Sequence, residues 1–267
     1  MSLEFEKSPI QFSQEKYFSS TGIINYPFFT GISANTWDEF SMLMSSLSSE
    51  DGLVVTPELM TYVGLPFKNL FEERENIESK VVQVQQISQK KDLSILLGTP
   101  TFVDGQVRNS ALLIQNGEII DQTNKRAGLD HEEKIFFEFI PEEPPFILSE
   151  TKTAILICAD LPTSLIYDQY KDEYLNSVLK ATNRDLLIGK SPTFIAGDCT
   201  RLIVMSCWAT GSIFSDANEA HFRIQMRNIA WKCMKYNPQI EEISFIDRVP
   251  KDKIGIFSPL NAYFAKK

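Results

Sequence analysis

The stretch ALLIQNGEIIDQ, residues 111–122, constrains the fold more than any other part of the sequence. Two short apolar runs, residues 111–115 and 118–122, flank the dipeptide Asn116-Gly117. An Asn-Gly pair between such runs is the strongest local signal for a two-residue β-hairpin, because both residues tolerate the positive φ that a type I′ turn requires. The sequence therefore predicts two adjacent antiparallel strands here, and a sheet that contains them cannot be purely parallel.

Short runs rich in β-branched and apolar residues predict further strands on both sides of this hairpin. They lie at residues 22–25, 52–56, 93–98, 154–158, 185–188 and 202–206. Helical periodicity lies between several of them, at residues 36–47, 70–91, 172–182 and 222–236. The first helix is expected to begin at Thr36, because Glu39 three residues later completes a capping box. Strands that alternate with helices predict an α/β fold in which helices pack outside mixed sheets.

The composition is that of an ordinary soluble globular protein: of 267 residues, 43% are hydrophobic and 23% are charged. That length suffices for one large hydrophobic core. No Pro- or Gly-rich linker and no internal repeat divides the sequence. We therefore expect a single domain over residues 1–267, with residues 1–20 as a flexible N-terminal arm.

Charge and cysteine content argue against several classes of function. The net charge is −9, from 26 basic and 35 acidic side chains, which disfavours nucleic-acid binding. No apolar run approaches the ~20 residues of a membrane helix, and the N-terminal residues lack the apolar segment of a secretory signal. The four cysteines form no C-x-x-C pair and there are only two histidines, so neither a disulfide framework nor a metal site is expected. These features predict a cytoplasmic protein without a metal, nucleic-acid or membrane partner.

Three potentially reactive side chains each follow a strand-like run: Glu58, Lys125 and Cys158. The carboxyl ends of strands are where α/β proteins place many of their functional groups. Taken singly, each has a simpler explanation, because such a glutamate is mostly solvated, such a lysine lies on the surface and such a cysteine is a small buried hydrophobe. Only their combination indicates a reactive site.

That combination resembles a known family. The segments LVVTPELMTYVG (residues 53–64), RNSALLIQNGEIIDQTNK (residues 108–125) and TAILICAD (residues 153–160) resemble, in order and spacing, the three signature regions of the carbon–nitrogen hydrolase (nitrilase/amidase) superfamily. The resemblance covers most of the chain. It implies a four-layer αββα sandwich, which agrees with the alternation of strands and helices.

The resemblance implies that Cys158 is the nucleophile, Glu58 the general base and Lys125 the residue that stabilises the transition state. These residue types suit the chemistry, because a carboxylate can take the thiol proton and an ammonium can stabilise developing charge. The oxygen of a tetrahedral intermediate would be held by Lys125 and by the backbone N–H of Ala159. No metal or organic cofactor is implied.

Two further site residues follow from the resemblance. The segment HEEKIFF, residues 131–137, resembles the family's Asp-Glu followed by an aromatic pair, which implies Glu133 as a second glutamate of the site. Glu132 is one residue away and could take that role, and an acidic helix start explains both equally well. Trp208 resembles part of the family's substrate pocket, although core packing explains a tryptophan there as readily.

The sequence departs from the family pattern beside both the cysteine and the lysine. After Cys158 the family usually continues Asp-x-Arg-Phe-Pro-Glu, whereas this chain has DLPTS at residues 160–164. The family's lysine is usually followed by His-Leu, whereas Lys125 is followed by Arg126-Ala127. In the family these stretches line the pocket, so the identity of the substrate stays open.

The resemblance favours a cysteine-dependent hydrolase that cleaves a non-peptide carbon–nitrogen bond of a small linear amide through a thioester acyl-enzyme. Amide is preferred over nitrile only because most of the family are amidases. Two alternatives remain: an N-acyltransferase that uses the same site, and a catalytically inactive binding homologue, against which the retention of all three reactive side chains argues. A homodimer is expected, because residues 222–236 resemble a late helix that often contributes to dimer contacts in the family.

Overall fold

Two mixed β-sheets form the centre of the protein. The computed structural model describes residues 13–19, 22–63, 67–126, 135–140, 146–158, 160, 199–206, 230, 234, 238–247 and 260–266. The N-terminal sheet has the strand order β2 (Ile23–Tyr26), β3 (Phe29–Ile32), β4 (Leu53–Val55), β5 (Ser94–Val103), β6 (Gln106–Gln115), β7 (Glu118–Asn124). The C-terminal sheet has the order β1 (Ser13–Ser19), β12 (Leu260–Lys266), β11 (Glu242–Asp247), β10 (Arg201–Ser206), β9 (Thr153–Ile157), β8 (Ile147–Leu148).

The two sheets have the same plan of strand directions. In each, three neighbouring strands are parallel: β3, β4 and β5 in the N-terminal sheet, and β9, β10 and β11 in the C-terminal sheet. An antiparallel strand pairs with each edge of the parallel set: β2 and β6 in the N-terminal sheet, β8 and β12 in the C-terminal sheet. One further strand, β7 or β1, then pairs antiparallel with β6 or β12. The sheets are therefore mixed, as the hairpin signal predicts.

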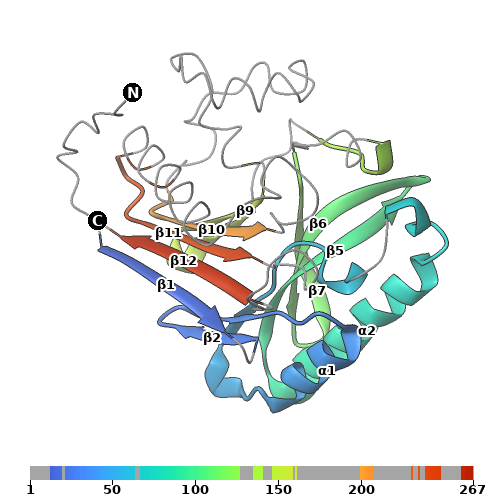
Figure 1. Ribbon diagram of the computed structural model, residues 1–267, viewed down its shortest axis with the longest axis horizontal. Coiled ribbons are helices and arrows are strands. Elements are labelled where there is room, and N and C mark those ends of the chain that lie inside the picture. Colours follow the sequence, from blue (N-terminus) through green and yellow to red (C-terminus); the bar gives the residue numbers. More distant parts are fainter. Residues whose placement is uncertain are drawn as a thin grey trace.

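Helices α1 (Trp37–Ser46) and α2 (Arg74–Lys91) lie on the side of the N-terminal sheet that faces away from the C-terminal sheet (Figure 1). Thr36 caps α1 as predicted, since its hydroxyl accepts a hydrogen bond from the Glu39 amide at 3.2 Å. Four short 3₁₀ turns complete the described elements: η1 (Ser49–Asp51), η2 (Met60–Tyr62), η3 (Phe67–Asn69) and η4 (Ser149–Thr151).

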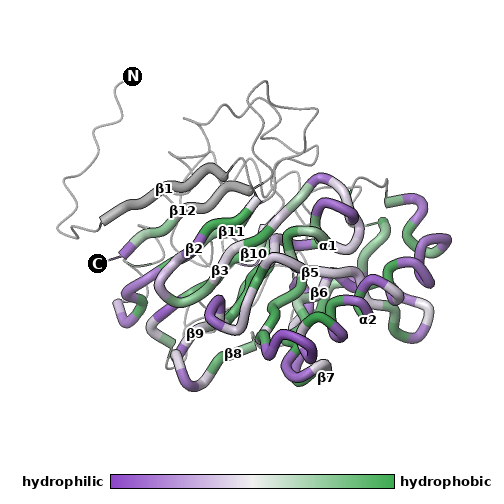
Figure 2. The backbone as a smooth tube through the Cα atoms, turned by 90° about the horizontal axis from the view of Figure 1, so that it is seen from below, coloured by the Kyte–Doolittle hydropathy of each residue, from purple (hydrophilic) through white to green (hydrophobic). Residues whose placement is uncertain are grey.

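Two apolar clusters separate the layers. The inter-sheet cluster includes Val55 and Ala111 from the N-terminal sheet together with β9, β10 and β11 residues. The helix-side cluster joins residues of α1 and α2 to Leu112 and Ile114 of β6. Because successive side chains of a strand point to opposite faces, the odd-numbered residues of this part of β6 face the other sheet and the even-numbered ones face the helices. Figure 2 shows the strongly hydrophobic stretches in the central strands and hydrophilic turns along α2.

The predicted hairpin is confirmed in detail. Strands β6 and β7 flank Asn116 and Gly117, whose φ angles are 51° and 83°. The helical patterns at residues 36–47 and 70–91 correspond to α1 and α2. The helix and strand expected at residues 172–182 and 185–188 lie outside the described residues. Of residues 222–236 only Ala230 and Met234 are described, and both are helical and buried in the inter-sheet cluster.

One expectation needs correction at the N-terminus. Residues 13–19, predicted as part of a flexible arm, form strand β1 at the edge of the C-terminal sheet. All seven residues pair with β12 in an antiparallel register. This pairing gives the polar groups of the backbone hydrogen-bond partners. The sequence of this segment lacks the strong alternation of apolar residues that would have predicted a strand.

No described helix combines the length and apolar character that crossing a membrane requires. Within the same residues, no three His, Cys, Asp or Glu side chains come together in a way that suits a metal ion.

Candidate active site

Glu58 follows β4 in a loop that lies tightly against β5. The Thr56 hydroxyl accepts a hydrogen bond from the Gly98 amide at 2.8 Å, and the Thr56 amide donates to the Leu96 carbonyl at 3.0 Å. A Cβ atom at Gly98 would lie 2.1 Å from the Pro57 oxygen and 2.6 Å from the Glu58 Cα. Only glycine allows this approach, so Gly98 fixes where the Glu58 backbone sits.

Lys125 directly follows β7 and contacts Glu58. Its amide donates to the Asn109 carbonyl at 2.7 Å, which extends the pairing of β7 with β6 by one residue. Its Nζ lies 3.1 Å from Glu58 Oε2, and Asn109 Nδ2 donates to the same oxygen at 3.0 Å. Two donors, one within β6 and one directly after β7, thus hold one carboxylate oxygen.

This ion pair is almost fully removed from solvent, since Glu58 is 3% and Lys125 2% exposed. Two charges in such a setting depend on each other, because removal of one partner of a buried pair typically costs about 3–5 kcal/mol. A lysine that served only solubility would extend into water. Burial of the pair therefore argues for a specific role of both residues.

Cys158 lies on a tight turn at the carboxyl end of β9. Its φ is 46°, in the left-handed region that residues with a side chain rarely adopt. Its amide donates to the Met205 carbonyl at 2.8 Å, which holds the turn against β10. A conformation of this kind has an energetic cost and persists only where the surrounding structure enforces it, often at a functional site. The residue is buried in the inter-sheet cluster together with Val55 and Ala111.

Asp160 connects the Cys158 turn to the end of β7. Its Oδ1 accepts a hydrogen bond from the Arg126 amide at 2.8 Å, and its Oδ2 accepts one from the Ile157 amide at 3.1 Å. The Arg126 guanidinium lies 3.8 Å from Oδ2. Burial raises the pKa of Asp160, while the positive charge of Arg126 and the backbone hydrogen bonds oppose that rise. Since Arg126 follows Lys125 directly, this carboxylate ties the cysteine turn to the lysine.

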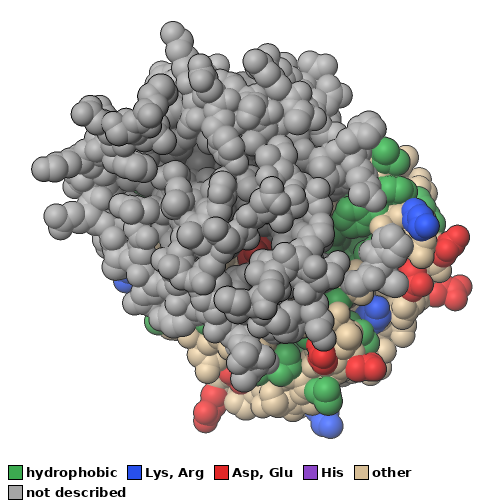
Figure 3. All heavy atoms as spheres, in the orientation of Figure 1, with side chains coloured by type: hydrophobic (Ala, Val, Ile, Leu, Met, Phe, Trp, Pro, Cys, Tyr) green, Lys and Arg blue, Asp and Glu red, His purple; other side chains and the backbone are tan. Residues whose placement is uncertain are grey.

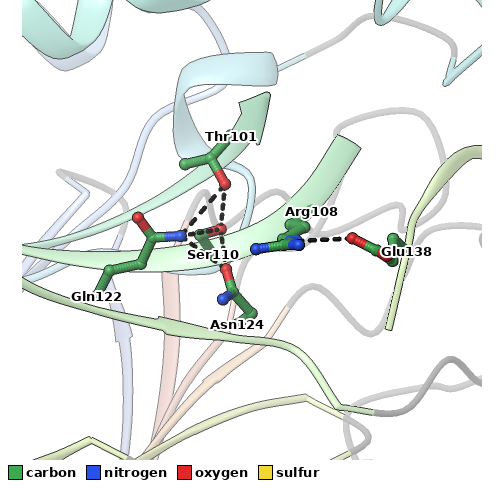
Figure 4. A network of polar contacts seen from close by, with 6 residues as sticks. All are labelled: Thr101, Arg108, Ser110, Gln122, Asn124 and Glu138. Atoms are coloured by element: carbon green, nitrogen blue, oxygen red, sulfur yellow. Dashed lines mark hydrogen bonds and ion pairs between the residues drawn. The ribbon is translucent and has the colours of Figure 1, made fainter. Parts of the chain in front are cut away.

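A second polar network occupies the opposite face of β6 (Figure 4). It consists of Thr101, Ser110, Gln122 and Asn124, with the ion pair Arg108–Glu138 beside it. Ser110 Oγ and Gln122 Nε2 donate to Asn124 Oδ1 at 2.7 and 2.8 Å. Ser110 has the same parity as Leu112, so this network faces the helix side and is separate from Glu58.

The structure thus brings Glu58 and Lys125 into direct contact and links Cys158 to them through Asp160. Ala159, Glu132, Glu133 and Trp208 lie outside the described residues. Sequence reasoning missed the contacts of Asn109, Gly98 and Arg126. Asn109 stands within the hairpin segment that carries the resemblance, but nothing in a single sequence says which side chain it touches.

The described surface shows acidic side chains along the rim with basic ones interspersed, and no broad basic patch on that part of the face in view (Figure 3). This agrees with the negative net charge of the chain.

No protein-family model matches the sequence, and neither does any curated protein. Solved structures do match. A mutant amidase from Nesterenkonia sp. AN1, which carries the acetamide moiety of fluoroacetamide on its active-site cysteine, has a TM-score of 0.54 at 15% identity over 84% of this chain and 81% of that chain. Another mutant of the Nesterenkonia AN1 amidase, described as from the nitrilase superfamily, has a TM-score of 0.50 at 14% identity over 85% and 81% of the two chains. The chain has the nitrilase-superfamily fold.

Another matching structure belongs to a much longer protein. Glutamine-dependent NAD⁺ synthetase from Acinetobacter baumannii matches with a TM-score of 0.50 and 16% identity over 79% of this chain, and the match spans only 34% of that protein. In this fold the described part of the chain supplies the two central sheets and the helix layer over the N-terminal sheet. The α/β sandwich expected from the sequence is confirmed.

Proposed function

We propose that this protein is a cysteine-dependent amidase that hydrolyses the carbon–nitrogen bond of a small linear amide. The observation that carries the proposal is the buried Glu58–Lys125 pair, tied through Arg126 and Asp160 to a cysteine on a strained strand-end turn. A base, a cation and a thiol so arranged are the groups that covalent catalysis at an amide carbon requires. The fold supports the hydrolase class.

The first half of the proposed reaction forms a thioester. Glu58 accepts the proton of the Cys158 thiol, and the sulfur attacks the amide carbon. The carbonyl oxygen becomes negatively charged and is stabilised by the Lys125 ammonium and the backbone N–H of Ala159. The intermediate then collapses, the carbon–nitrogen bond breaks, and Glu58 returns its proton to the departing nitrogen, which leaves as ammonia or an amine.

The second half restores the thiol. Water attacks the thioester carbon while Glu58 takes one of its protons, and the same oxyanion donors stabilise the second tetrahedral intermediate. The carbon–sulfur bond breaks, the carboxylic acid leaves, and Cys158 regains its proton. Atoms balance with water as the only other reactant, and the scheme calls for no cofactor.

Two side chains outside the described residues belong to this proposal. Glu133 would orient Lys125 or the attacking water, and Trp208 would contact the substrate. Glu133→Gln should slow turnover while thermal stability changes little. Equal activity in that variant together with a slow Glu132→Gln would move the role by one residue.

The test is a panel of small linear amides with ammonia detection, combined with intact-mass measurement of the acyl-enzyme. Hydrolysis by the wild-type protein and loss of kcat/KM by about 10² in Lys125→Met would support the proposal. A drop confined to KM would instead make Lys125 a substrate-binding cation.

An N-acyltransferase would form the same thioester. If amines are added to the assay and N-acyl products form faster than the carboxylic acid, that function is favoured. The homodimer and the cytoplasmic location remain predictions, and light scattering measures the first.

A further inference from the structure

The side-chain oxygen of Asn109, inside the candidate site, is a hydrogen-bond acceptor without a donor among the described residues. Its side chain is 0% exposed. Its Nδ2 donates to Glu58 Oε2 at 3.0 Å, but its Oδ1 has no hydrogen-bond partner among the described residues. An ionised carboxylate only accepts hydrogen bonds, so the amide nitrogen must face Glu58 and the oxygen must point elsewhere. A buried carbonyl oxygen without a donor costs free energy, and native proteins rarely retain one without a reason.

We propose that Asn109 Oδ1 accepts a hydrogen bond from the N–H of the scissile carboxamide and thereby selects amides over nitriles and esters. This inference rests on the proposed amidase function and adds a specificity-determining residue to it. A primary carboxamide presents N–H donors at its nitrogen. A nitrile nitrogen and an ester oxygen present only lone pairs, so either would leave Oδ1 unpaired and face it with a second acceptor.

The position of Asn109 suits this role. The two polar atoms of one side-chain amide sit on the same carbon, so Oδ1 lies beside the nitrogen that contacts Glu58. In the proposed reaction Glu58 returns a proton to the departing nitrogen. A hydrogen bond from that nitrogen to Asn109 would keep it next to this carboxylate while the carbon–nitrogen bond breaks.

Asn124 provides a matched comparison within the same pair of strands. It is also buried and also lies on the β6–β7 hairpin, but on the helix-side face. Its Oδ1 accepts hydrogen bonds from Ser110 and Gln122, so it has the donors that Asn109 Oδ1 lacks. Replacement of Asn124 should therefore cost stability without altering selectivity.

The experiment compares an amide that the wild-type protein hydrolyses with the p-nitrophenyl ester of the same acyl group. Both acylate Cys158 to give the same thioester, and kcat/KM reports that acylation step for each. Asn109→Ala and Asn109→Leu should lower the amide-to-ester ratio of kcat/KM by about tenfold or more, because the amide alone loses a hydrogen bond. Asn124→Ala should leave the ratio unchanged.

Equal loss with both substrates in the Asn109 variants would overturn the inference, since Asn109 would then only position Glu58. If the Asn109 variants do not fold, a second measurement with Asn109 intact tests the same inference. In calorimetry, Cys158→Ala should bind the amide at least about tenfold more tightly than the matching nitrile. Equal affinities would also overturn the inference. If the wild-type protein neither hydrolyses amides nor forms an acyl adduct at Cys158, the proposed function fails and the inference with it. An active protein with an unchanged ratio contradicts the inference alone.

Discussion

The N-terminal and C-terminal sheets have the same order of strand directions but contribute different groups to the candidate site. The N-terminal sheet supplies a buried pair of opposite charges, Glu58 after β4 and Lys125 after β7. The C-terminal sheet supplies Cys158 in a left-handed conformation. Neither sheet carries both the proposed nucleophile and its base, so the chemistry depends on how the two are joined.

A small polar contact joins the two sheets, and we call Asp160 with its hydrogen bonds to Ile157 and Arg126 the joint. Asp160 accepts backbone hydrogen bonds from both sides, from Ile157 of the C-terminal sheet and from Arg126 at the end of the N-terminal sheet. The apolar inter-sheet cluster holds the layers together without direction, whereas these hydrogen bonds fix a register between strand ends. The comparison therefore predicts large effects for changes at the site and at the joint, and small ones elsewhere.

The largest effect is expected from Glu58→Gln, which removes the proposed base from the N-terminal sheet. Turnover should fall by about 10³-fold or more, because an amide cannot accept the thiol proton. Circular dichroism should show a folded protein, since the glutamine oxygen can still accept from Lys125, but stability should fall by about 3–5 kcal/mol because the buried ammonium loses the charge of Glu58. Glu138→Gln is the control: it breaks the ion pair with Arg108 on the other face and should keep wild-type kcat. A near-normal kcat in Glu58→Gln would show that Glu58 is not the general base.

Gly98→Ala tests the backbone support of Glu58. The new methyl group would clash with the Pro57 oxygen and the Glu58 Cα, so the loop must shift. A displacement of about 1 Å in such a site can cost about 10²-fold in rate, and the overpacking about 1–3 kcal/mol of stability. In Gly105→Ala nothing lies within 4 Å of the new Cβ, but φ is +78°, so that variant should lose stability alone. Matching kinetics for both variants would argue against the role of Gly98.

Asp160→Asn tests the joint between the sheets. An asparagine offers one acceptor oxygen where Asp160 uses two, and it removes the negative charge that lies 3.8 Å from the buried Arg126 guanidinium. We expect about 3 kcal/mol lower stability in urea unfolding and about tenfold lower kcat, as the cysteine turn loses its tie to Lys125. The double variant with Arg126→Met should regain part of the stability but not the rate. Full recovery of both would show that Asp160 only neutralises a charge.

How much of this could be read from the sequence depends on whether a residue acts locally. The Asn116-Gly117 hairpin and the Thr36 cap are confirmed because their geometry is set within a few residues. The Glu58–Lys125 contact joins residues 67 positions apart and was predicted only through the family resemblance. Strand β1 was missed because its partner β12 lies at the far end of the chain.

The supporting contacts could not be predicted at all from one sequence. Gly98 matters because the loop after β4 approaches it closely. The residues next to Gly98 in the sequence give no sign of that approach. Asp160 belongs to a motif that the resemblance identified, but its hydrogen bond to the Arg126 amide appears only once the sheets are packed.

The smallest effect is expected at the end of the C-terminal sheet away from the site. Burial raises the pKa of Glu242, which begins β11, although Tyr26 and Arg201 oppose the rise. A carboxyl group with a raised native pKa contributes stability that is full below its unfolded pKa and is lost as pH rises through the native pKa. Glu242→Gln lacks this loss, so its urea midpoint relative to that of the wild type should increase as pH rises above the ordinary glutamate pKa of about 4.3. A pH-independent difference, or a change in kcat, would contradict this reading.

The most direct test of the central claim, that Cys158 is the nucleophile, is alkylation by iodoacetamide at neutral pH followed by peptide mapping. A thiol beside a base and a cation forms its reactive thiolate more readily than one in an apolar setting. We predict that Cys158 is modified first and that activity is lost in proportion to its modification, while Cys199, also buried, stays unmodified. Complete loss of activity with Cys158 unmodified would show that another group carries the chemistry.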